Sequence, residues 1–222
     1  MKQEQLPGLA PHSVLIIDPH DLVRFGLEKL VAASAGLRLV GLASSLAEGL
    51  RLVEALRPDL VISDLTTGDS SGLDTVRALV AAQGTRGTLI VSAHDEALYA
   101  EQALLLGARG YVMKDHAAAT TVLAAHTVLR GAIWVSPDIQ VQFLNRLSRP
   151  VAAAAPGRGR APHLSERELK IVGLLKSGKT TKQIAGALGV STRTVDVHRA
   201  GIKRKLGLRT GAELVAYASS HF

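Results

Sequence analysis

The chain has 222 residues, a formal net charge of +7 and no cysteine. This length is sufficient for two domains, with a sizeable core in at least one of them. The lack of cysteine excludes disulfides, thiolate metal sites and thiol catalysis, and is typical of a reducing compartment. No uncharged apolar run approaches the roughly 18 residues that span a bilayer, and the first residues lack the apolar core of a signal peptide. We therefore expect a cytoplasmic protein that contacts no membrane.

The charge is divided unevenly along the chain. Residues 1–149 contain 13 Lys and Arg against 15 Asp and Glu, whereas residues 150–222 contain 13 against 4. A basic segment beside a nearly neutral one indicates that polyanion binding is confined to the C-terminal third. A basic surface that only aids solubility is the alternative.

The N-terminal part alternates β-rich runs with helical patterns, which is typical of a parallel sheet covered by helices on both faces. The predicted strands are Val14–Asp18, Leu37–Ala43, Leu60–Asp64, Thr88–Ser92 and Gly110–Lys114. The predicted helices, which have apolar residues at helical spacing, are Leu22–Ala33, Leu46–Leu56, Leu73–Ala82, Ala97–Leu106 and Ala117–Leu129. The pattern predicts an α/β fold, a (βα)5 doubly wound parallel sheet with the flavodoxin-like strand order 2-1-3-4-5.

The predicted domain organisation has four parts. A tail at 1–12 precedes the α/β domain at 13–134. Segment 135–163 contains a predicted helix, Pro137–Leu147, followed by a linker rich in Pro, Gly and Arg. Residues 164–222 form an all-α domain of four helices.

The all-α domain has the signals of a helix-turn-helix. A capping box, Ser165 to Glu168, begins a helix that reaches about Lys176, and Thr181–Leu188 and Thr192–Leu206 follow with a short turn between them. Thr210 to Glu213 begins a fourth helix. In this motif the second helix of the pair enters the major groove of DNA, so Thr192–Leu206 is the predicted reading helix. Its buried stripe is predicted to be Val195, Ile202 and Leu206, packed against Ile184, Ala185 and Leu188.

Four polar residues end neighbouring strands of the predicted sheet: Asp18, Asp64, Ser92 and Lys114. Singly, each is an ordinary solvated residue, but the carboxyl ends of parallel strands share one edge, where doubly wound folds bind ligands. The set suits phosphoryl capture, in which a carboxylate attacks phosphorus while a lysine, a cation and a hydroxyl stabilise the oxygens. Asp64 is the candidate phosphoacceptor, and Asp18, Ser92 and Lys114 complete the pocket.

The four pocket residues and two surrounding motifs, Pro58–Leu65 and Gly107–Asp115, resemble the receiver domain of response regulators. The resemblance extends over about Ser13 to Arg130. The resemblance implies a sensor histidine kinase as partner, Tyr111 as the aromatic switch residue, and Mg²⁺ held by Asp18 and Asp64. Receivers have two adjacent acidic residues after the first strand, and here Pro19 stands in the second position. Because Mg²⁺ prefers oxygen ligands, the loss should weaken its binding unless Asp21 or Asp69 replaces the missing carboxylate.

The C-terminal motifs Leu164–Glu168, Thr181–Ala185, Val190–Arg199 and Lys205–Thr210 resemble the LuxR-type domain of NarL/FixJ-type regulators. The resemblance implies a homodimer on double-stranded DNA, paired through the last helix by Ala212, Leu214 and Val215. From the pattern and the resemblance together, the candidate DNA-binding residues are Thr181, Lys182, Thr192, Arg193, Thr194, Asp196, Val197, His198, Arg199, Lys203, Arg204 and Lys205. Asp196 and Gly201 depart from the usual residues. Asp196 either accepts from cytosine N4, repels phosphates, or only orients Arg193 or Arg199.

Two hypotheses for the input stay open. In the first, Asp64 is phosphorylated and the receiver then dimerises; in the second, the domain works through constitutive dimerisation or a regulatory protein partner. A phosphatase would need a second acid two residues after its nucleophile, and Asp18 and Asp64 both lack it, so we expect no enzyme. The sequence is also compatible with a docking module or an RNA-binding protein. The histidines, His20 included, are predicted to have no ligand role.

Overall fold

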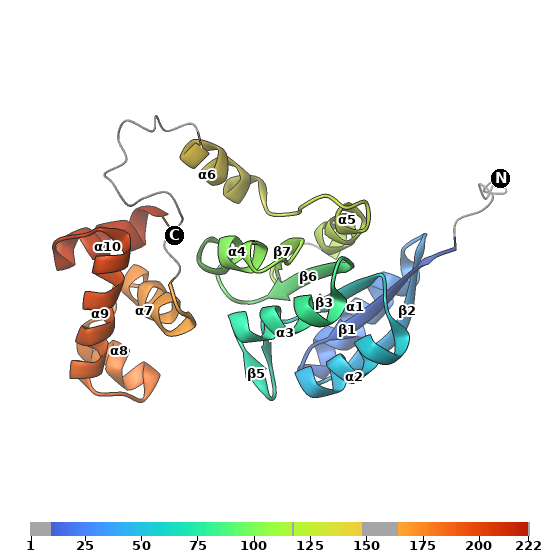
Figure 1. Ribbon diagram of the computed structural model, residues 1–222, viewed down its shortest axis with the longest axis horizontal. Helices are drawn as coiled ribbons and strands as arrows, with labels where there is room; N and C mark the ends of the chain where they lie inside the picture. Colours follow the sequence, from blue (N-terminus) through green and yellow to red (C-terminus); the bar gives the residue numbers. More distant parts are fainter. Residues whose placement is uncertain (1–9, 117, 148–163, 222) are drawn as a thin grey trace. The chain divides into compact units, whose positions relative to one another are not determined.

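The computed structural model describes residues 10–116, 118–147 and 164–221 (Figure 1). They form two compact units: residues up to His94 together with Ala103–Ser136, and Asp95–Gln102 together with the residues from Pro137 onwards. The predicted linker at 149–163 and most of the predicted tail lie outside the described residues. Within the described ranges, no helix has the length and apolar character that crossing a membrane requires.

The first unit contains a five-stranded parallel sheet. Its strands are β1 (His12–Ile17), β2 (Leu37–Ala43), β3 (Leu60–Ser63), β6 (Gly87–Ser92) and β7 (Gly110–Met113), in the order β2-β1-β3-β6-β7. Counted in chain order, these five strands have the predicted order 2-1-3-4-5, so that prediction is confirmed. The helices between and after them are α1 (Asp21–Ala33), α2 (Leu46–Leu56), α3 (Leu73–Gln83), α4 (Glu96–Leu105) and α5 (Ala118–Leu129).

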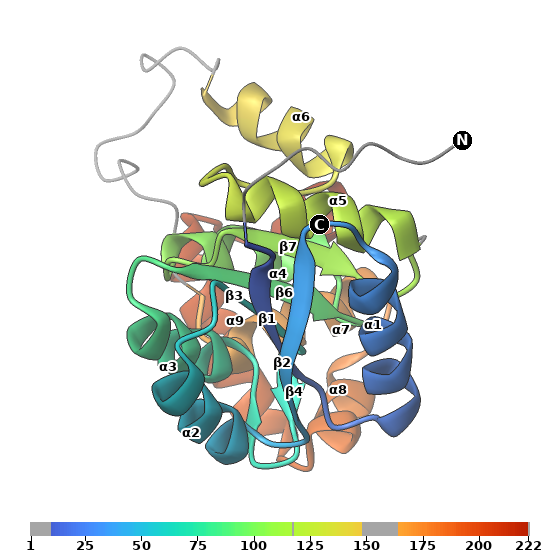
Figure 2. The same cartoon turned by 90° about the vertical axis from the view of Figure 1, so that its right-hand side faces the viewer.

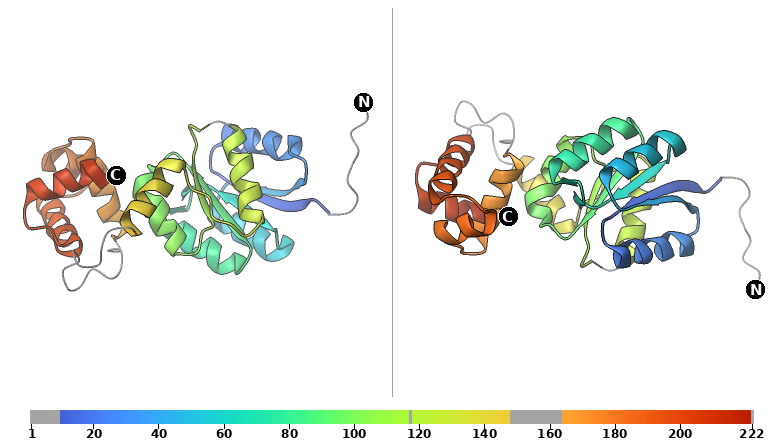
Figure 3. Two further views of the ribbon diagram at one scale, coloured as in Figure 1. Left: turned by 90° about the horizontal axis from the view of Figure 1, so that it is seen from above. Right: turned by 90° about the horizontal axis from the view of Figure 1, so that it is seen from below.

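The strands are apolar on both faces because helices cover both (Figures 2 and 3). Val14 and Ile16 of β1 pack on the side of α1 and α5, which contribute residues such as Leu27 and Val128. The alternate residues Leu15 and Ile17 face the opposite side, where Val53 of α2 and Leu79 of α3 close a second core. The two cores fix the position of each strand end and therefore of the polar residues that follow it.

A small hairpin that the sequence did not predict follows β3. Its strands are β4 (Thr66–Thr67) and β5 (Ser70–Ser71), paired antiparallel. At its tip, the Asp69 carboxylate accepts hydrogen bonds from the backbone N–H groups of Ala47, at 2.9 Å, and Leu46, at 2.7 Å. These bonds lower the pKa of Asp69. The hairpin is thereby attached to the N-terminus of α2, where a negative charge is favourable.

The second unit contains α6 (Pro137–Leu147), α7 (Glu166–Lys176), α8 (Thr181–Leu188), α9 (Thr192–Leu206) and α10 (Gly211–His221). The predicted capping box at Ser165 and Glu168 is present, and Thr180 with Gln183 forms another before α8. Ser191 is the N-cap of α9, whose buried residues are the predicted Val195, Ile202 and Leu206. Gly189 allows the tight turn between α8 and α9 because it has a left-handed backbone with φ 63°.

An ion pair with a buried carboxylate joins α7 to α9. Lys205 Nζ donates to Glu168 Oε2 over 2.6 Å. Burial alone would raise the pKa of Glu168, but the hydrogen bonds from Lys205 and Ser165 outweigh it and the pKa is lowered. A Cβ atom at Gly201 would lie 3.3 Å from Glu168 Oε1, so a glycine here leaves room for that carboxylate.

We expect Lys205→Ala to destabilise α7 and α9 at pH 7 by about 1 kcal/mol, because Glu168 keeps its buried charge and loses its partner, which is itself partly exposed. The corresponding increase in hydrogen exchange of their peptides is about fivefold, measurable by mass spectrometry on the full chain. Because the folded pKa of Glu168 is lowered, the pair stabilises the unit above the ordinary glutamate pKa of about 4.3 and ceases to do so as the pH falls through the lowered value. The difference between the two proteins should therefore diminish at acidic pH. Equal hydrogen exchange of the α7 and α9 peptides in the wild type and the variant at pH 7 would contradict a stabilising role of this ion pair.

Candidate functional site

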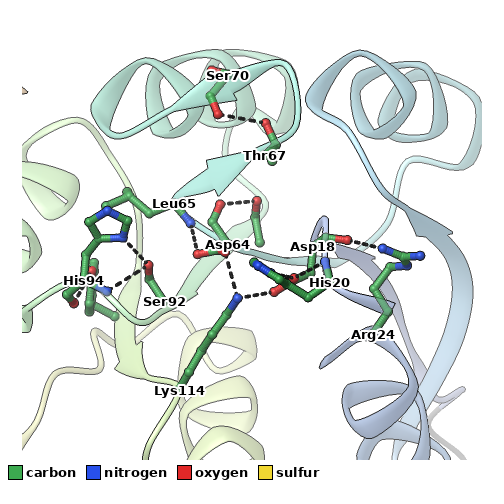
Figure 4. Close-up of polar contacts among 12 residues, drawn as sticks. Asp18, His20, Arg24, Asp64, Leu65, Thr67, Ser70, Ser92, His94 and Lys114 are labelled. Atoms are coloured by element: carbon green, nitrogen blue, oxygen red, sulfur yellow. Dashed lines mark hydrogen bonds and ion pairs between the residues drawn. The ribbon is translucent and has the colours of Figure 1, made fainter. Parts of the chain in front are cut away.

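The parallel sheet brings the four predicted pocket residues to one edge (Figure 4). Asp18 follows β1, Asp64 follows β3, Ser92 ends β6 and Lys114 follows β7. Backbone hydrogen bonds hold these ends in register: Asp64 N–H donates to Ile17 O over 2.9 Å, and Lys114 N–H donates to Ser92 O over 2.8 Å. The predicted convergence at the carboxyl edge of the sheet is present.

One ammonium lies between two buried carboxylates at this edge. Lys114 Nζ is 2.7 Å from Asp64 Oδ2 and 2.6 Å from Asp18 Oδ2. The side chains of Asp18 and Asp64 are 1% and 5% exposed, so water screens their charges little. Leu65 N–H donates to Asp64 Oδ1 over 2.7 Å. The pocket therefore has two negative charges and one positive charge in a poorly solvated space.

His20 belongs to this cluster, which the sequence analysis did not predict. The turn at Pro19 brings the ring Nδ1 to 3.0 Å from Asp18 Oδ1, and the His20 N–H donates to the same oxygen over 2.9 Å. Ligand atoms of Asp18, His20 and Asp64 all lie within 4.8 Å of one another. This geometry would allow His20 to act as a ligand, and the expectation that it has no ligand role stays a prediction.

Neither acidic residue that could replace the missing carboxylate at position 19 is placed to do so. Asp21 pairs with Arg24 and its side chain is 93% exposed. Asp69 is held by the backbone of α2 through two N–H groups. The pocket thus offers two carboxylates and an imidazole instead of the oxygen-rich set that Mg²⁺ prefers, so its residues do not fit Mg²⁺ well.

Ser92, His94 and Tyr111 form a connected group beside the pocket. Ser92 is fully buried, and its Oγ is 3.1 Å from Nδ1 of His94. The Tyr111 hydroxyl donates to the backbone carbonyl of His94 over 2.9 Å, and its ring is buried. Ser92, the predicted hydroxyl of the pocket, and Tyr111, the predicted switch residue, therefore both contact His94. His94 was not predicted to belong to the pocket.

The surface of α9 carries most of the predicted DNA-binding residues. Exposed along it are Thr192, Arg193, Asp196, Val197, Arg204 and Lys205, and half-buried are Thr194, His198, Arg199 and Lys203. Val197 is 65% exposed on this polar helix face. Arg193, Asp196, Val197 and Arg204 lie on the side of α9 opposite its buried stripe, which is the side available to a groove, whereas Lys205 faces α7.

Some of the predicted residues have contacts within the unit. Arg199 Nη1 donates to Thr181 Oγ1 over 2.7 Å, so Thr181, and not Asp196, orients Arg199. Lys205 pairs with Glu168, and contact with DNA would require it to leave that carboxylate. Leu214 is 0% exposed and belongs to the core of its own unit, so its prediction as a dimerisation residue is wrong. Ala212 and Val215 are exposed on α10, and Lys182 is exposed on α8.

The residues that sequence reasoning missed differ in how well they could have been found. The spacing Asp18-Pro19-His20 was a usable signal, since a turn at proline can return a side chain two positions later towards the strand end. His94 two residues after Ser92 has the same spacing. The pair of Glu168 and Lys205, 37 residues apart, had no local signal.

Two family models match the chain. Residues 14–126 match the response regulator receiver domain, and residues 162–218 match bacterial regulatory proteins of the luxR family. The matches cover the pocket described above and the helices α7 to α10, with the segment between them unmatched.

Relatives align with both parts of the chain. The chain is 33% identical to the transcriptional regulatory protein UhpA of Salmonella typhimurium over 91% of this chain and 95% of that protein. It is 30% identical to the transcriptional regulatory protein MctR of Rhizobium johnstonii over 94% and 93%. The structure of RcsB from Salmonella enterica serovar Typhimurium, bound to a promoter with a phosphomimetic, has a TM-score of 0.58, 21% identity and coverage of 94% and 98%, and supports the fold. The chain therefore belongs to the response regulators that join a receiver domain to a LuxR-family regulatory domain.

Proposed function

We propose that this response regulator binds double-stranded DNA as a homodimer through α9 and regulates transcription in the cytoplasm, under the control of phosphorylation at Asp64. The observation that carries the proposal is the buried Asp64 carboxylate with the Lys114 ammonium 2.7 Å away at the ligand-binding edge of the sheet. In this function the chain catalyses no reaction beyond transfer of the phosphoryl group to and from Asp64.

The transfer step uses one oxygen of Asp64 as nucleophile. A carboxylate oxygen attacks the phosphorus of a phosphohistidine or a small phosphoramidate, and an O–P bond forms as the donor's N–P bond breaks. The leaving nitrogen keeps the electron pair and takes a proton. Lys114 neutralises charge on the transferred oxygens, and the N–H of Leu65 already donates to the carboxylate. Hydrolysis of the acyl phosphate returns Asp64 to its starting form.

The new charge has a short path to the segment after β6. A phosphoryl group carries about −1.5 to −2 charges and three strong acceptor oxygens. If Ser92 donates to one of these oxygens, its contact with His94 is lost or rearranged. The backbone carbonyl of His94 also accepts from Tyr111, so both buried side chains respond to the same residue. Phosphorylation then shifts the equilibrium between two arrangements of the His94 segment, which changes the surface available for dimerisation.

The DNA-binding end supplies both positioning and base contacts. Arg193, Lys203 and Arg204 provide positive charge for phosphates, and the exposed Val197 is suited to a thymine methyl group. Asp196 is exposed and remains the candidate for cytosine N4. Pairing through the exposed Ala212 and Val215 of α10 would place two copies of α9 at half-sites about ten base pairs apart.

A second candidate function, a regulator that acts without phosphorylation, is favoured by one observation. Pro19 removes a carboxylate from the pocket, and neither Asp21 nor Asp69 replaces it. In such a regulator, Lys114 stays paired with Asp18 and Asp64, and constitutive dimerisation or a protein partner controls DNA binding.

We expect phosphoramidate to phosphorylate the wild-type chain, and Asp64→Asn to abolish the reaction because the nucleophilic oxygen is lost. Intact-protein mass spectrometry measures the modification, with Mg²⁺ and Mn²⁺ tested separately. Beryllofluoride should increase the dimer fraction of the wild type, measured by sedimentation velocity. Asp74→Asn, which changes an exposed aspartate on α3, is the matched control and should behave as wild type. A wild-type chain that neither gains mass nor dimerises with either metal would establish the second candidate instead.

On the DNA side, Arg199→Ala and Lys203→Ala should each weaken binding, because each removes a positive charge from α9. If the lost contact is to a phosphate, the slope of log affinity against log salt concentration should fall by up to about 0.9. Fluorescence anisotropy on a selected duplex at several KCl concentrations measures the slope. Lys29→Ala, on α1 of the other unit, is the control for a simple change in net charge. Unchanged slopes in both α9 variants would remove these residues from the phosphate-contacting set.

A further inference from the structure

The pocket has more buried negative charge than its own residues neutralise. Asp18 and Asp64 are both more than nine-tenths buried, and Lys114 is the ammonium shared between them. Lys114 donates its hydrogen bond to Asp64 Oδ2. Asp18 Oδ2 lies 2.6 Å from the ammonium but accepts no hydrogen bond from the residues that the structure describes. A buried carboxylate oxygen with an incomplete set of partners indicates that a further cation is favourable here.

The third ligand of this cluster is a nitrogen. His20 lies beside Asp18, and the ligand atoms of the three residues are within 4.8 Å of one another. Its ring is 65% exposed, and it is the N-cap of α1 without a capping hydrogen bond from its side chain. The imidazole can therefore turn towards an ion without breaking a contact on which the helix depends.

The chemistry of this donor set discriminates between metals. Mg²⁺ is a hard cation that prefers oxygen ligands and keeps its waters, whereas imidazole suits transition metals such as Zn²⁺, Fe²⁺ and Ni²⁺. Two carboxylates with one imidazole are compatible with Mn²⁺, which accepts oxygen and nitrogen ligands in the octahedral geometry that Mg²⁺ also adopts. Replacement of an acidic residue by Pro19, followed by His20, thus changes the preferred metal and need not abolish metal binding.

We infer that the pocket binds a divalent transition metal, with Mn²⁺ as the probe, in preference to Mg²⁺, through Asp18, Asp64 and a ring nitrogen of His20. This inference goes beyond the proposed phosphorylation, because metal binding requires no phosphoryl donor. An experiment can therefore distinguish a failure of metal binding from a failure of Asp64 phosphorylation.

The test is a titration of the untagged full chain with Mn²⁺ or Mg²⁺ alone, by calorimetry and by pulsed electron paramagnetic resonance of bound Mn²⁺. Wild type should bind Mn²⁺ at least about tenfold more tightly than Mg²⁺, with a directly coordinated ¹⁴N in the resonance spectrum. His20→Ala should lose the ¹⁴N signal and weaken Mn²⁺ binding by about tenfold or more, with little change for Mg²⁺. His126→Ala, which changes a histidine on α5 near Gly36, just before β2, is the control and should keep the signal.

A second variant tests the selectivity from the opposite direction. His20→Asp makes the donor set all oxygen, so the preference for Mn²⁺ over Mg²⁺ should diminish towards unity or reverse. Because aspartate is a good N-cap residue, this variant should fold at least as well as the wild type, which circular dichroism checks. Wild-type Mn²⁺ binding without a ¹⁴N signal, equal affinities for both metals, or a His20→Ala variant that binds Mn²⁺ like wild type would each overturn the inference. Phosphorylation of Asp64 in the presence of Mg²⁺ would stand independently of any of these outcomes.

Discussion

The Lys114 ammonium between the Asp18 and Asp64 carboxylates is the interaction on which the function of the first unit depends. Its position is set by the register of β1, β3 and β7, whose apolar residues leave no freedom at the strand ends. Two carboxylates with so little exposure repel one another unless a cation lies between them. Because these charges are poorly screened, a phosphoryl group added to Asp64 would strongly change the electrostatic interactions in the pocket.

The connection from the pocket to the rest of the unit passes through His94. Its ring meets Ser92 and its backbone carbonyl meets Tyr111, so a side chain outside the predicted set joins the hydroxyl to the aromatic residue. On the other side of Asp64, the β4–β5 hairpin is held to α2 by Asp69. These bonds hold the hairpin in place when Asp64 is modified. On the other side, the contact of Ser92 with His94 is one that a phosphoryl oxygen can replace.

The sequence predicted those features that depend on periodic burial and local capping. The helices Leu46–Leu56 and Thr181–Leu188 have the bounds expected from their apolar spacing, and the buried stripe of α9 is as expected. The hairpin was missed because strands of two residues, Thr66–Thr67 and Ser70–Ser71, are too short for a period. Leu214 was assigned to a dimer surface because apolar spacing on a terminal helix does not distinguish a face buried in its own unit from one that meets a partner.

At the pocket, strand-end positions were sufficient to predict Asp18, Asp64, Ser92 and Lys114, since a parallel sheet aligns its carboxyl ends. They were insufficient for His20, whose approach to Asp18 depends on the backbone turn at Pro19. Local pattern was also insufficient for Lys205, which faces Glu168 across two helices. A local backbone turn decides the contact of His20, and a partner 37 residues away decides the contact of Lys205.

The cation requirement of two buried carboxylates, together with the imidazole beside them, determines how this receiver works. This dependence can be tested by a crystal structure grown with Mn²⁺ and beryllofluoride, with anomalous scattering recorded at the manganese edge. We expect one manganese ion bound by Asp18, Asp64 and His20, with Lys114 withdrawn from Asp18 towards the fluoride group on Asp64. A pocket without manganese, in which Lys114 still lies between the two carboxylates, would contradict it.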